Sequence, residues 1–119
     1  MSTISTVLIV LVALEFFYIM YLETFATTSD ATSRVFNMTK EELERKSVNT
    51  LFKNQGIYNG LISLGLLYGL FLSNAPLEIS RLLLIYIIFV ALYASLTSNK
   101  KIILTQGGLA ILALISTVF

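Results

Sequence analysis

The chain has 119 residues, of which 56% are hydrophobic and 13% are charged, with a net charge of +1 and a mean hydropathy of +0.84. This composition is far from that of a water-soluble domain and predicts a membrane protein whose partner is the membrane lipid. Because Cys and His are absent and the basic residues form no long cluster, we expect no metal site, no cofactor and no nucleic-acid partner.

Four apolar segments have the length of a membrane-spanning helix, which needs roughly 20 residues. The predicted spans cover residues 4–22, 54–73, 77–97 and 102–119. Residues 24–53 form a polar connection, in which Thr39 and Glu42 have the spacing of a capping box and predict a helix that starts near Lys40 and continues into the second span. The fold class predicted for residues 1–119 is therefore all-α, a single four-transmembrane-helix bundle.

The basic residues predict the orientation of the chain. Seven of the eight Lys and Arg residues lie in or beside the first and third connections. These seven are Arg34, Lys40, Arg45, Lys46, Lys53, Lys100 and Lys101, whereas only Arg81 lies near the second connection. Since Lys and Arg accumulate on the cytoplasmic side, we expect a multi-pass protein of the cell membrane with residues 24–53 in the cytoplasm and both termini outside.

Polar side chains inside the spans are candidates for function, because a charged residue at the bilayer centre costs about 3 kcal/mol even on the milder scales. Glu15 lies near the middle of the first span, and no basic residue at that depth can balance its charge. We therefore expect Glu15 to hold a proton at neutral pH, or to share one with a tyrosine or amide partner. The candidate partners are Tyr18, one turn further along, and Asn59 and Gln106 at similar depth. The candidates for ligand binding or proton coupling are Glu15, Tyr18, Tyr21, Asn54, Gln55, Tyr58, Asn59, Tyr93 and Gln106.

Some of these polar residues have a second interpretation. For Tyr93 and Gln106 we favour hydrogen bonds that only join neighbouring helices. Glu23, at the end of the first span, is expected to form an ion pair with Lys53 at the membrane interface. No catalytic residue is identified.

The second predicted span contains two pairs of glycines with the spacing that allows helices to approach closely. The pairs are Gly56 with Gly60 and Gly65 with Gly69, and at 100° per residue they point in nearly opposite directions. This pattern predicts a central helix that packs against neighbours on two sides.

Several motifs together resemble the DUF1304 family of small membrane proteins, over essentially the full chain. They are Glu15-x-x-Tyr18-x-x-Tyr21-x-Glu23, Arg34-x-Phe36, Asn54-Gln55-Gly56-x-Tyr58-Asn59-Gly60 and Lys101-Ile102-x-Leu104-x-Gln106. The resemblance implies a four-helix membrane fold and a role for the polar residues, but no activity, since the family is a domain of unknown function. The chain departs from the family pattern at Phe16, where a histidine is common.

Three functions are consistent with this pattern. The first is binding or transport of a small hydrophobic or amphipathic molecule with proton exchange on Glu15, by analogy with small four-helix multidrug transporters. The second is an intramembrane lipid-processing enzyme, which we favour less, with Glu15 as proton shuttle and Tyr18 and Asn59 orienting the substrate. The third is a non-catalytic subunit of a larger membrane complex. The strong charge bias favours a monomer or a parallel homodimer.

Overall fold

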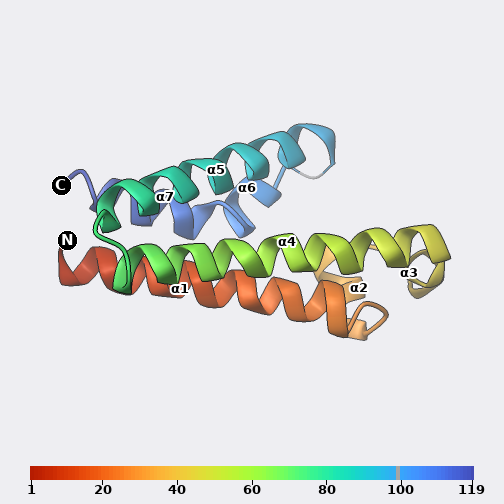
Figure 1. The fold of residues 1–119 in the computed structure, drawn as a ribbon. Helices are drawn as coiled ribbons and strands as arrows, with labels where there is room; N and C mark the ends of the chain where they lie inside the picture. The colour runs from red at the N-terminus through yellow and green to blue at the C-terminus, as the bar shows by residue number, and fades with distance from the viewer. Residues whose placement is uncertain (99) are drawn as a thin grey trace. The chain divides into compact units, whose positions relative to one another are not determined.

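The computed structural model describes residues 1–98 and 100–119, and every regular element within these ranges is helical. In chain order the elements are α1 (Thr3–Met20), the π-helix η1 (Tyr21–Phe25), α2 (Asp30–Phe36), α3 (Lys40–Glu44), α4 (Lys46–Phe71), α5 (Pro76–Thr97), α6 (Ile102–Thr105) and α7 (Gly108–Ser116) (Figure 1). The all-α prediction is confirmed. Asn99, in the predicted third connection, lies outside the described residues.

The chain divides into two compact units. The first unit comprises Met1–Leu14 and Leu64–Phe119, and the second comprises Glu15–Ser63. The division falls within α1 and α4, so each of these helices contributes residues to both units.

Among the described residues, two helices are long and apolar enough to cross a membrane, namely Thr3–Phe25 and Pro76–Thr97. Helix α4 has 26 residues, but its first half carries amide side chains that lower its hydropathy. The predicted fourth span is not one regular helix, because α6 ends at Thr105 and α7 begins at Gly108. By length and composition, the structure therefore supports two of the four predicted spans.

The polar connection folds into short helices with defined ends. The capping box predicted at α3 is present: Thr39 Oγ1 accepts a hydrogen bond from the Glu42 backbone N–H at 3.1 Å, and Glu42 Oε1 accepts one from Thr39 N–H at 3.0 Å. The helix that starts at Lys40 does not run unbroken into the second predicted span: α3 and α4 are separate, because Arg45 leaves the helical conformation with ψ of 131°.

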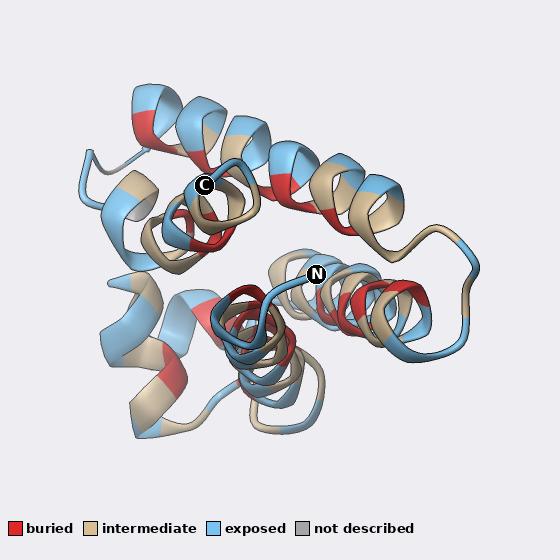
Figure 2. Ribbon diagram, turned by 90° about the vertical axis from the view of Figure 1, so that its left-hand side faces the viewer, coloured by how far each residue is buried: buried red, intermediate tan, exposed pale blue. Residues whose placement is uncertain are grey.

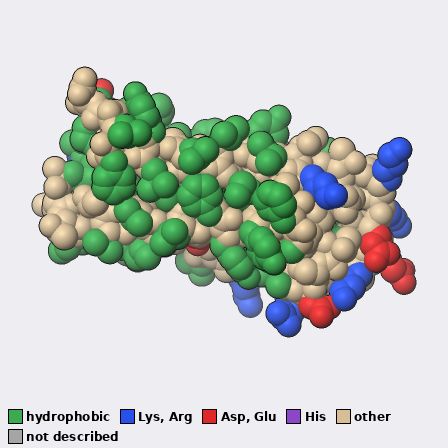
Figure 3. Space-filling view, turned by 60° about the horizontal axis from the view of Figure 1, so that its bottom comes forward, with side chains coloured by type: hydrophobic (Ala, Val, Ile, Leu, Met, Phe, Trp, Pro, Cys, Tyr) green, Lys and Arg blue, Asp and Glu red, His purple; other side chains and the backbone are tan. Residues whose placement is uncertain are grey.

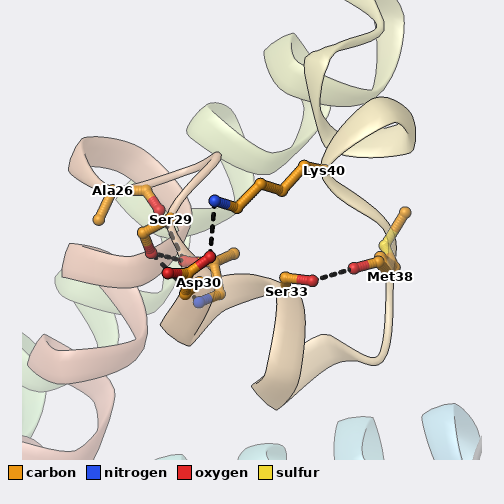
Figure 4. A network of polar contacts seen from close by, with 7 residues as sticks. Ala26, Ser29, Asp30, Ser33, Met38 and Lys40 are labelled. Carbon is orange, nitrogen blue, oxygen red and sulfur yellow. Dashed lines mark hydrogen bonds and ion pairs between the residues drawn. The ribbon is translucent and has the colours of Figure 1, made fainter.

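Two further contacts fix the path of the chain between α2 and α3 (Figure 4). Lys40 Nζ lies 2.6 Å from Asp30 Oδ1, and Ser33 Oγ donates a hydrogen bond of 2.5 Å to the Met38 carbonyl. Between them, Asn37 adopts the left-handed conformation with φ of 53°, which Asn tolerates better than most residues. The chain therefore turns back at Asn37, and α3 starts close to the beginning of α2.

In the first unit, α5 packs against α6 and α7 through one face. Its buried residues recur every three or four positions and are Ser80, Leu84, Ile87, Ala91 and Ser95. Figure 2 shows buried and exposed residues on opposite sides of the long helices. Ala110 and Ala113 of α7 are buried as well, and such small side chains allow helices to approach closely.

The end of α7 is held by a basic side chain of α5. Arg81 donates to the Thr117 carbonyl through Nη2 at 2.7 Å and to Thr117 Oγ1 through Nε at 3.2 Å. Because the last carbonyls of a helix lack partners within the helix, Arg81 serves as a C-terminal cap.

Candidate functional site

Glu23 is the most completely enclosed charged residue of the second unit, with 0% of its surface exposed. Its Oε1 accepts a hydrogen bond from Asn59 Nδ2 at 2.6 Å, and its Oε2 accepts one from Gln55 Nε2 at 2.8 Å. Gln55 and Asn59 are four residues apart on α4 and therefore lie on the same side of that helix. Two neutral amides thus satisfy both carboxyl oxygens of Glu23.

Two glycines of α4 make this close approach feasible. A Cβ on Gly56 would lie 1.9 Å from Thr24 Oγ1 and 3.1 Å from the Cβ of Glu23, and a Cβ on Gly60 would lie 2.3 Å from Met20 Sδ. A larger residue at position 56 would force Thr24 or α4 itself to move, whereas at position 60 the flexible end of the Met20 side chain would have to give way. The amide pair and the glycine pair are offset by one residue, so the same face of α4 supplies both the bonds and the space.

The backbone that carries Glu23 is a π-helix, in which the Ala26 N–H bonds to the Tyr21 carbonyl at 2.9 Å. Side chains that follow η1 in the sequence satisfy its carbonyls: Thr27 Oγ1 donates to the Glu23 carbonyl at 2.7 Å, and Thr32 Oγ1 lies 3.0 Å from the Leu22 carbonyl. Short π-helical turns within α-helices are rare and frequently lie at functional sites.

The predicted ion pair between Glu23 and Lys53 is wrong. Within the described ranges no ion pair joins these residues; the Lys53 side chain is exposed, and its carbonyl accepts a hydrogen bond from Thr24 Oγ1 at 2.9 Å. Lys53 precedes Gln55 by two positions, which corresponds to about 200° around a helix, so its side chain points away from Glu23. The i,i+4 spacing of Gln55 and Asn59 beside the two glycines is the signal that could have identified the true partners.

Glu15 has different surroundings from Glu23. Its side chain is partly buried, and Oε1 is buried without a hydrogen-bond partner in the described part of the chain. The expected hydrogen bond from Tyr18 is not formed, and Tyr18 is 53% exposed. The carboxyl of Glu23 in η1 is therefore fully bonded, whereas that of Glu15 in α1 has an unused, buried oxygen.

The other candidate residues are not gathered around either carboxyl. Tyr21, Asn54 and Tyr58 of the second unit are exposed, as is Tyr93 of the first unit. Gln106 is partly buried and lies at the interruption between α6 and α7. Among the predicted candidates in the described part of the chain, Gln55 and Asn59 are the two whose side chains bond to Glu23.

Comparison with known proteins identifies the family of this chain. Residues 10–118 match the family described as "Protein of unknown function (DUF1304)". The chain is 78% identical to "Uncharacterized protein YpaA" of Lactococcus lactis subsp. lactis (strain IL1403), over 119 residues that cover the whole of both chains. No solved structure matches. The chain therefore belongs to the DUF1304 family.

Proposed function

We propose that this chain is an integral membrane protein with four spans, which binds or transports a small hydrophobic or amphipathic molecule and exchanges a proton on Glu15. The observation that carries the proposal is the buried, unpartnered Oε1 of Glu15. An isolated carboxylate is costly in hydrocarbon, so such a group either holds a proton or pairs with a bound molecule. Glu23 is less suited to exchange, because both of its oxygens already accept hydrogen bonds.

The surface of the chain supports a membrane location. Hydrophobic side chains cover much of the face seen in Figure 3. Large apolar residues of the long helices are more than half exposed, among them Ile4, Leu14, Leu61, Leu82 and Phe89. Soluble proteins rarely expose apolar surface on this scale, whereas a lipid environment favours it.

Two features are compatible with α4 as the second membrane span and with α6 and α7 together as the fourth. In α4, the side chains of Gln55 and Asn59 bond to Glu23 instead of facing lipid unpaired. Between α6 and α7, helical hydrogen bonds continue from Gly107 N–H to the Ile103 carbonyl at 3.1 Å and from Ile111 N–H to the Gly107 carbonyl at 2.9 Å. These bonds pair part of the backbone at the interruption, which a membrane segment requires.

The proposed topology can be tested by labelling, because the natural chain contains no cysteine. We expect a membrane-impermeant maleimide to label Ser2→Cys and Phe119→Cys in intact cells, and to label Ser47→Cys only after the membrane is opened. The reverse pattern would overturn the orientation. Labelling of Ser2→Cys and Phe119→Cys on opposite sides would overturn the four-span arrangement.

The proposed binding can be tested with three fluorescent probes of different charge, namely neutral Nile red, cationic ethidium and anionic anilinonaphthalene sulfonate. The protein in lipid nanodiscs should bind at least one probe with an affinity that depends on pH, and Glu15→Gln should remove that dependence. The matched control is Glu78→Gln, which replaces an exposed acid in the first turn of α5. A pH dependence that is equal in both variants, or absent for all three probes, would refute proton exchange on Glu15.

A further inference from the structure

We infer that the molecule bound at Glu15 is a monovalent organic cation with an apolar body, an inference that rests on the proposed function and names its ligand class. The starting point is the lack of any compensating group. In the described chain, no hydrogen bond or ion pair reaches Glu15 Oε1 from Tyr18 or Glu23 of the same helical segment, or from Lys53 or Tyr58 of α4. A positive charge at this carboxylate has to come from the ligand.

The change in charge on Glu15 when it loses its proton decides which class of ligand can bind there. When Glu15 loses its proton, one negative charge is left in a site of low dielectric constant, and an unpaired buried charge is strongly unfavourable. A monovalent cation restores neutrality: the neutral acid releases one proton to water, and its carboxylate pairs with the cation. A neutral ligand leaves the charge uncompensated and an anion doubles it, so neither can be exchanged for a proton in this way.

The residues around Glu15 on α1 favour an organic cation over a metal ion. The positions one turn away are Leu11, Val12, Tyr18 and Ile19, all apolar or aromatic. A Na⁺, Ca²⁺ or Mg²⁺ ion would require several further oxygen ligands, which these side chains cannot provide. An apolar cation needs only the carboxylate and hydrophobic surface, and the ring of Tyr18 adds a cation–π contact within reach of the same face.

The exposure of these neighbours differs between the two sides of α1. Val12 and Ile19 are 0% and 7% exposed, whereas Leu11 and Tyr18 are 42% and 53% exposed. Glu15 therefore lies at the boundary between the packed side of α1 and its exposed side. We infer that a lipophilic cation dissolved in the bilayer approaches the carboxyl from the exposed side of this helix, where Tyr18 lies.

The test compares two ions of nearly equal shape and opposite charge, tetraphenylphosphonium and tetraphenylborate, by calorimetry on the protein in nanodiscs. Tetraphenylphosphonium should bind with release of one proton, measured from the heats in two buffers of different ionisation enthalpy. Its affinity should rise about tenfold per pH unit while Glu15 is protonated, as linkage of one proton requires. In Glu15→Gln the affinity should fall by at least tenfold and become independent of pH.

Three outcomes separate this inference from the proposed function. If tetraphenylborate or neutral Nile red shows the pH-dependent, Glu15-dependent binding and tetraphenylphosphonium does not, the cation class is wrong while proton exchange on Glu15 stands. If no probe depends on Glu15, both fail. Glu15→Asp keeps the carboxyl, so retention of pH-dependent tetraphenylphosphonium binding in Glu15→Asp, with equal helicity in both variants, shows that the loss in Glu15→Gln reflects the missing charge.

Discussion

Replacing Asn59 with Ala should destabilise the protein, because it removes one of the two amides that bond to Glu23. The bond from Asn59 Nδ2 to Glu23 Oε1 is 2.6 Å long, and Glu23 is 0% exposed. Loss of this bond leaves a buried acceptor without a partner, which costs about 1–3 kcal/mol. Ala is a better helix former than Asn by up to about 0.7 kcal/mol, which partly offsets the loss.

Asn54→Ala is the matched control, since Asn54 lies on the same helix and is exposed. Both variants gain the same helix propensity, so their difference in the free energy of unfolding isolates the bond to Glu23. We expect a difference of about 2 kcal/mol, or roughly 30-fold in the unfolding equilibrium. The assay is reversible unfolding in mixed detergent micelles, followed by circular dichroism. Equal stability of the two variants would refute the account of Glu23.

Three further predictions concern the second unit and its connection. Gly56→Ala should lower the melting temperature, because the added Cβ would lie 1.9 Å from an oxygen of Thr24, whereas Gly108→Ala, which meets nothing within 4 Å, should leave it unchanged or raise it. Thr39→Ala should remove the cap of α3 at a cost of about 1 kcal/mol, seen as faster amide exchange in that helix without change elsewhere. The ion pair with Lys40 holds the pKa of the Asp30 carboxyl below its usual 3.8. The stabilising effect of this ion pair should therefore persist at neutral pH and disappear in acid, below that usual value. An Asp30→Asn variant should show no such acid-dependent step.

The sequence was sufficient to predict the helical class, the capping box at Thr39 and the close packing at Gly56 and Gly60. These features depend on local spacing, which the chain displays directly. The side of the helix that each tyrosine occupies could not be predicted in the same way. A helix that is apolar all round gives no amphipathic signal for its packed face, and Tyr18 and Tyr58 proved to be exposed.

The hydrogen-bond partners of Glu23 could not be predicted for a different physical reason. The π-helix at Tyr21–Phe25 adds a residue to the turn that contains Glu23, so directions counted at 100° per residue from α1 no longer hold there. Nothing in the apolar sequence marks this change. The gap between α6 and α7 was missed for a similar reason, because Gly107 and Gly108 lie in a segment that is apolar enough to suggest one continuous helix.

The account assigns different roles to two carboxyls that lie eight residues apart in the sequence, Glu15 of α1 and Glu23 of η1. Glu23 bonds to Gln55 and Asn59 of α4, and we propose that Glu15 exchanges the proton. The most direct measurement is carbon NMR of glutamate labelled at the side-chain carboxyl, in nanodiscs, with and without tetraphenylphosphonium. The account predicts that the cation shifts the Glu15 resonance, identified by its absence in Glu15→Gln, and leaves that of Glu23 in place. A shift confined to Glu23, or no shift of either carboxyl, would contradict it.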